Sequence, residues 1–127
     1  MEAQPSTSGA IGRLRQTTAA LCLLVAAVAA IGLGLEIANR LRLFWFTYNS
    51  QPGMNHVADG YFSMVYLASA AAMVMGLAAA WMFHRRLWRV TAGSFGALNL
   101  ALCAAFLVLH QTAMLVTYSE FVTIYGP

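Results

Sequence analysis

Residues 60–83, GYFSMVYLASAAAMVMGLAAAWMF, form a run of 24 residues without a charged side chain. As an α-helix, such a run rises about 36 Å at about 1.5 Å per residue. The hydrocarbon core of a bilayer is about 30 Å thick, so the helix can cross it with some tilt. The stretch therefore predicts a membrane-spanning helix.

Two further uncharged runs lie on either side of this one, at residues 16–35 and 90–119. The first is also long enough to cross a bilayer, and it exceeds the apolar core of a typical secretory signal, so we expect it to be retained as a span. The third would measure about 45 Å as a single helix, but it is too short for two spans. We expect its surplus to protrude from the membrane or to bend near Gly93 and Gly96.

The composition excludes an ordinary water-soluble domain. Hydrophobic residues make up 61% of the 127 and charged residues only 9%, whereas soluble domains carry about 25% charged residues. All seven basic residues are Arg, and they lie at the ends of the apolar runs, so the positive net charge reflects membrane topology and not nucleic-acid binding. No extramembrane part is large enough for a conventional pocket, which argues against a soluble small-molecule substrate.

These observations predict an all-α integral membrane protein, a bundle of three transmembrane helices in a single domain, residues 1–127. The short connector between the second and third spans makes them an antiparallel hairpin. The parts, in order, are a flexible polar tail (1–16), the first span (about 17–37), an aromatic interfacial segment and loop (38–59), the second span (about 60–83), a basic connector (84–89), the third span (about 90–118) and a tail (119–127).

The distribution of Arg predicts the orientation in the membrane. Three Arg lie in the connector and two in the N-terminal tail, against two just beyond the first span. By the positive-inside rule the N-terminus then lies on the positive-inside face. We expect a multi-pass protein of a bacterial inner membrane, or of an organellar inner or photosynthetic membrane.

Small residues at four-residue spacing are typical of helices that pack closely in lipid, where the hydrophobic effect contributes little between helices. Each span carries such a strip, and together the strips predict a tight bundle or tight docking onto neighbouring helices. The alternative is coincidence in an Ala-rich sequence. The strips are Ala26, Ala30 and Gly34 in the first span, Ala68, Ala72, Gly76 and Ala80 in the second, and Gly93, Ala97, Ala101 and Ala105 in the third.

Aromatic and basic residues cluster where the spans should meet the headgroup layer. Residues 43–48, LFWFTY, contain four aromatic side chains, and Glu36 and Arg40 just before them are spaced for an ion pair along a helix. The connector combines Arg with Trp and could bind an anionic lipid such as cardiolipin. The predicted interfacial or headgroup residues are His84, Arg85, Arg86, Trp88, Arg89 and Trp45.

His110 lies inside the third run, where an ionisable side chain is costly unless it has a partner. Helical spacing aligns it with Asn99, Cys103 and Thr117 as a polar stripe. His110 is therefore a candidate ligand of haem or of chlorophyll magnesium, or a hydrogen-bonding partner of a quinone, with the cofactor held mainly by partner subunits. The alternative is a neutral imidazole bonded to another helix.

The sequence carries no GxSxG, HExxH, glycine-rich phosphate loop or paired carboxylates, so we expect no enzymatic activity. Cys22 and Cys103 lie in apolar runs and should behave as small hydrophobic side chains. His56 and Asp59 lie in the first loop, where we expect them to be solvated, and we expect no metal site there.

We therefore expect a small non-catalytic accessory subunit of a larger membrane complex, of the respiratory or photosynthetic energy-transducing kind. Its partners would be other membrane subunits and anionic lipids. Two alternatives remain open: an anchor that holds haem, chlorophyll or quinone through His110, and a self-associating membrane scaffold or pore.

Overall fold

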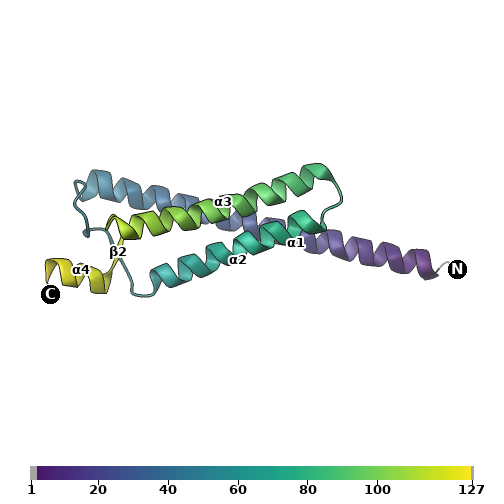
Figure 1. The fold of residues 1–127 in the computed structure, drawn as a ribbon, viewed down its shortest axis with the longest axis horizontal. Coiled ribbons are helices and arrows are strands. Elements are labelled where there is room, and N and C mark those ends of the chain that lie inside the picture. The colour runs from purple at the N-terminus through teal and green to yellow at the C-terminus, as the bar shows by residue number, and fades with distance from the viewer. Residues whose placement is uncertain (1–2, 127) are drawn as a thin grey trace.

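A computed structural model of the chain describes residues 3–126. Three long helices, α1, α2 and α3, lie along one another, and the short elements gather at the end opposite the N-terminus (Figure 1). The elements are α1 (Ala3–Arg42), the π-helix η1 (Leu43–Thr47), β1 (His56–Val57), α2 (Tyr61–Met82), α3 (Arg86–Gln111), β2 (Val116–Thr117) and α4 (Tyr118–Tyr125).

The three long helices confirm the predicted helical class. Each is long and apolar enough to cross a membrane: α2 and α3 have 22 and 26 residues, and the first candidate span, Gly9–Thr47, comprises most of α1 together with η1. Most of their large apolar side chains are exposed, as expected for helices that meet lipid tails. The chain is thus compatible with a multi-pass membrane protein.

The α2–α3 hairpin has its tightest contact at two glycines. A Cβ added to Gly76 would lie 2.7 Å from the backbone nitrogen of Gly96, and a Cβ added to Gly96 would lie 3.2 Å from the carbonyl oxygen of Met73. Ala79 and Ala92 are fully buried in the same interface. The two backbones therefore touch, in the way that small residues allow in membrane helices.

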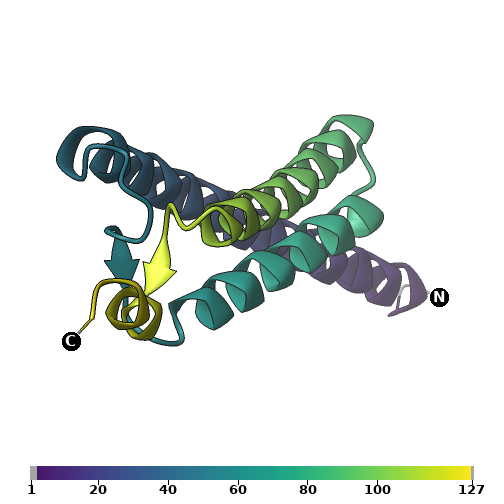
Figure 2. The ribbon, with the colours of Figure 1, turned by 60° about the vertical axis from the view of Figure 1, so that its left-hand side comes forward.

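α1 crosses this hairpin diagonally, as Figure 2 shows. Its contact face is narrow and made of small residues, with Ala19 and Ala26 fully buried and Ala30 nearly so. The fully buried Asn99 of α3 donates from Nδ2 to the carbonyl oxygen of Ala26, at 3.0 Å, and so joins α1 to the hairpin. Ala26 and Ala30 thus lie where the small-residue strip of the first span requires, and so do the buried Ala72 and Gly76 of α2.

The predicted strip of the third span does not pack inside the bundle, and its docking onto neighbouring helices stays a prediction. Ala97 and Ala101 are exposed, and the buried face of α3 instead contains Ala92, Gly96 and Asn99. One residue turns a helix by about 100°, so the two strips lie on different faces. At the other end of the first strip, Gly34 has no atom within 4 Å of an added Cβ, so it makes no close helix contact among the described residues.

Two predicted boundaries are also corrected. The polar lead-in is helical from Ala3 onward and forms the first part of α1. At its end, Arg15 and Gln16 bond to the end of α2. The third run is not one long helix, because α3 ends at Gln111 and Ala113 adopts a left-handed backbone with a φ of 59°.

The C-terminal tail folds as a separate helix, α4, against the first loop. Thr117 and Glu120 form a capping box at its N-terminus. β1 and β2 pair in parallel, with His56 beside Val116, and the His56 ring stacks on Phe121 at a centroid distance of 4.4 Å. Asp59 accepts hydrogen bonds from the backbone N–H and the hydroxyl of Ser119, at 3.1 and 2.6 Å. The loop and the tail thus make one small cap.

We predict that Gly76→Ala lowers the thermal stability of the purified protein in detergent, because the new methyl group would overlap the Gly96 backbone. Overpacking of this kind costs about 1–3 kcal/mol. Gly32→Ala is the matched control, since nothing lies within 4 Å of its added Cβ. Equal melting temperatures for Gly76→Ala and the unaltered chain would contradict the close contact.

Candidate functional site

The two ends of the bundle differ in charge. Among residues 3–126, the end where α2 passes into α3 carries five Arg and one His and has no carboxylate. The opposite end carries two Arg and three carboxylates. The basic end has Arg13, Arg15, His84, Arg85, Arg86 and Arg89, and the opposite end has Arg40, Arg42, Glu36, Asp59 and Glu120.

The last carbonyl groups of α2 are satisfied by side chains of the basic end. Arg15 donates from Nε to Met82 O at 3.1 Å and from Nη2 to Trp81 O at 3.0 Å, and Gln16 donates from Nε2 to Met82 O at 3.0 Å. The Arg15 guanidinium also lies 4.9 Å from the centre of the Trp81 ring. Cations favour the negative end of a helix dipole, so these bonds both cap α2 and hold α1 against it.

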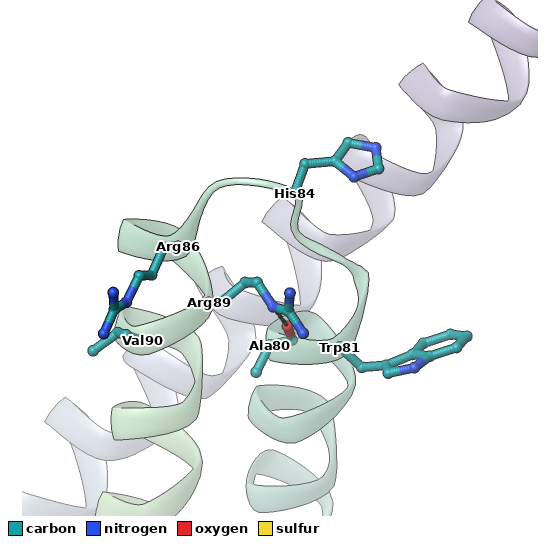
Figure 3. A pocket seen from close by; sticks show the side chains of 6 residues that line it. All are labelled: Ala80, Trp81, His84, Arg86, Arg89 and Val90. Atoms are coloured by element: carbon teal, nitrogen blue, oxygen red, sulfur yellow. Dashed lines mark hydrogen bonds between the residues drawn. The ribbon is translucent and has the colours of Figure 1, made fainter.

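A hollow of about 590 Å³ lies beside these hydrogen bonds, between the end of α2 and the start of α3 (Figure 3). Arg89 reaches across it and donates from Nε to Ala80 O at 3.2 Å. The guanidinium group of Arg86 extends along α3, away from that of Arg89, and His84 lies on the connector above both. The hollow is lined by Ala80, Trp81, His84, Arg86, Arg89 and Val90.

The chemistry of this hollow suits an anion. A guanidinium carries five N–H donors, and Arg89 uses only its Nε on the α2 carbonyl. In the part of the chain that the structure describes, neither Arg86 nor Arg89 has a carboxylate within ion-pair distance. Both Arg side chains line the hollow and have N–H donors left over, which can bind the oxygens of a phosphate group.

Two apolar grooves adjoin the basic end. One of about 450 Å³ runs between α1 and α3, and nearly all of its lining is apolar. The other follows the outer face of α3 and shares Val90 with the basic hollow. The first is lined by Ala20, Leu23, Leu24, Ala27, Phe83, Trp88, Thr91 and Phe95, and the second by Val90, Thr91, Ser94, Phe95 and Leu98.

The predicted headgroup residues fall at both ends of the bundle. All five from the connector, His84, Arg85, Arg86, Trp88 and Arg89, are exposed at the basic end. Trp45 lies at the opposite end in η1 and is 57% exposed. The structure therefore brings three of the six, His84, Arg86 and Arg89, into one hollow, while Trp88 lines the apolar groove.

At the opposite end, the predicted ion pair of Glu36 and Arg40 is confirmed, with 2.8 Å between Oε1 and Nε. Tyr61 donates to the same carboxylate oxygen at 2.9 Å. The buried Asn55 donates from Nδ2 to the backbone carbonyl of Arg40, which ties the first loop to α1.

His110 lies in the last turn of α3 and not deep inside a span. Its Nε2 is 2.8 Å from Glu120 Oε1, and its ring stacks on Phe62 at a centroid distance of 4.0 Å. The predicted polar stripe does not form, because Asn99 bonds to α1 and Thr117 caps α4. A cofactor bound through Nε2 would have to displace Glu120, and the ligand role of His110 stays a prediction.

Hydrogen bonds within the cap keep its carboxylates ionised. Burial acts to raise the pKa of Glu120, but its bonds with His110 and Thr117 outweigh burial and hold the pKa below the ordinary 4.5. The hydroxyl and backbone N–H of Ser119 likewise hold the pKa of the exposed Asp59 below 3.8. A lowered pKa means that these bonds stabilise the cap at neutral pH and are lost only as the pH falls through the lowered values.

No protein-family model, curated protein or solved structure matches this chain. Within residues 3–126, no three side chains of His, Cys, Asp or Glu gather closely enough to hold a metal ion. Cys22 and Cys103 are both unbridged and partly buried. The basic hollow and the two grooves beside it are therefore the candidate binding sites of this chain.

We predict that the Ser119 amide resonance, followed by NMR in detergent micelles, shifts with a midpoint below pH 3.8, because the amide reports protonation of Asp59. Asp59→Asn should abolish the shift while leaving the rest of the spectrum in place. A midpoint above 3.8 would show that the two groups are not bonded in solution.

Proposed function

We propose that this chain is a non-catalytic subunit of a larger membrane assembly, crossing the bilayer three times and holding a transmembrane helix of another subunit in the groove between α1 and α3. The groove is the observation that supports this proposal. Its lining comes from α1, α3 and Phe83, which follows α2, so its shape depends on the assembled bundle.

The groove combines small side chains on one wall with large side chains on the other, a surface on which a helix can pack. Ala20 and Ala27 provide small positions on α1, while Trp88 and Phe95 of α3 stand across from them. Side-chain ridges of one helix pack into grooves of this kind on another. In lipid, close contact over such a surface is the main source of association between helices.

Small residues continue along α1 beyond the groove. Ala20, Ala27 and Gly34 recur every seven residues, which returns to nearly the same face of a helix. This track is about 21 Å long, and no atom lies within 4 Å of a Cβ added to Gly32 or Gly34, so open space flanks α1 there. Small residues at this spacing allow the backbone of a second helix to approach α1 closely, which favours a helix as occupant.

The remaining features fit an accessory role. The segments outside the three long helices are short, and the first loop and the C-terminal tail bond to each other in the cap. That the complex belongs to an energy-transducing membrane stays a prediction from the sequence. The charge difference between the ends supports placing the basic end on the positive-inside face.

A photo-crosslinker at the groove tests the partner. We predict that a diazirine amino acid at Leu24, which lines the groove, crosslinks in native membranes to a different membrane protein. The same probe at Leu21 should crosslink only to lipid, although the two side chains are 58% and 59% exposed. Ala27→Leu fills the groove and should abolish the protein crosslink, whereas Ala101→Leu on the outer face of α3 should not.

Two outcomes would overturn this proposal. Lipid alone at Leu24 would mean that no helix occupies the groove. A crosslink to a second copy of the chain would instead indicate a self-associating scaffold.

We also predict the orientation. In a background with Cys22→Ala and Cys103→Ala, an impermeant maleimide should label Thr123→Cys in intact cells or right-side-out vesicles. It should label His84→Cys only after permeabilisation, because the five Arg of that end favour the inner face. The reverse pattern would contradict the assigned orientation.

A further inference from the structure

The basic hollow and the groove along the outer face of α3 share a wall. Arg86 and Arg89 line the hollow, Val90 belongs to both, and Thr91, Ser94 and Leu98 continue the groove along the helix. A cationic site therefore passes directly into an apolar track. A phospholipid has the same order of chemistry, with a phosphate at one end and acyl chains at the other.

We propose that this continuous surface binds one anionic phospholipid, with its phosphate between Arg86 and Arg89 and an acyl chain along α3. The acyl track shares Thr91 and Phe95 with the groove proposed for the partner helix, but Arg86, Arg89 and Ser94 line only the lipid surface, so variants at these three positions test it separately. Arg86 extends along α3 and Arg89 extends across toward the end of α2, so the two guanidinium groups lie on different sides of the hollow that both line. Ala80 O fixes the position of Arg89 through its Nε and leaves the terminal amino groups free of that bond.

Charge decides which lipid fits. Among the described residues of this end no carboxylate balances the arginines, so a lipid with a net negative headgroup gains more than a zwitterionic one. The exposed indole of Trp81 lines the same hollow, and indoles favour the headgroup layer. Thr91 and Ser94 turn their hydroxyls back to carbonyl oxygens of their own helix, Leu87 and Val90, and so leave the track apolar.

The test is native mass spectrometry of the full chain in detergent, titrated with phosphatidylglycerol or phosphatidylcholine. We expect selective binding of one phosphatidylglycerol. Each Arg near a charged headgroup contributes about fivefold to binding, so Arg86→Gln should weaken it about fivefold and the Arg86→Gln, Arg89→Gln pair about 25-fold. Arg42→Gln, at the opposite end and bonded to Asn39, is the matched control and should have no effect.

Further variants separate a lipid site from a phosphate site. Ser94→Phe should block the acyl track and weaken binding, whereas Leu100→Phe, on an exposed face of α3 turned about 120° away from Ser94, should not. Glycerol phosphate, which has the headgroup chemistry without acyl chains, should not compete. Because Arg86 has no bonding partner in residues 3–126, a folding defect in its variant is not expected, and unchanged melting temperatures check this.

Three results would overturn the inference. Equal binding of phosphatidylcholine would remove the role of charge. Equal loss in Arg42→Gln would mean general attraction and no defined site. Competition by glycerol phosphate would assign the hollow to free phosphate compounds.

Discussion

The close approach of α2 and α3 at Gly76 and Gly96 is the contact on which the rest of the bundle depends. It brings two backbones together with almost no side chain between them, so the register of the hairpin is fixed there. That register carries Arg89 across to the last turn of α2 and presents Asn99 to α1. The basic hollow and the seat for α1 are therefore both consequences of one contact between small residues.

Polar chemistry is sorted to the two ends and used differently at each. At the basic end, Arg15 and Arg89 bond mainly to carbonyl oxygens, and within residues 3–126 no carboxylate compensates their positive charge. At the other end, Glu36 and Glu120 each have a basic partner close by, so the charges nearly balance. One end is thus built to attract anions, and the other to hold its own loops together.

The sequence was sufficient to predict three long apolar helices, because the length of a run without charges does not depend on what the helix packs against. The sequence was insufficient to predict which face of α3 packs against α2, since an Ala-rich helix has several similar small-residue strips. In the structure, Gly76 of α2 contacts the strip that contains Ala92 and Gly96. The end of α3 was hidden because the uncharged run continues past it, although Thr117 and Glu120 stand at capping-box spacing and signal a new helix. The basic hollow was predictable in composition, but the shared wall with the α3 groove required the fold.

The pairing of β1 with β2 also orders events during biosynthesis. The paired segments are separated by 60 residues, with α2 and α3 between them. The first loop therefore has no strand partner until the ribosome has translated the whole hairpin, and contacts of such long sequence range form late in folding. Closure of this small ladder thus reports that both helices of the hairpin already stand side by side, which makes it a natural last step of maturation.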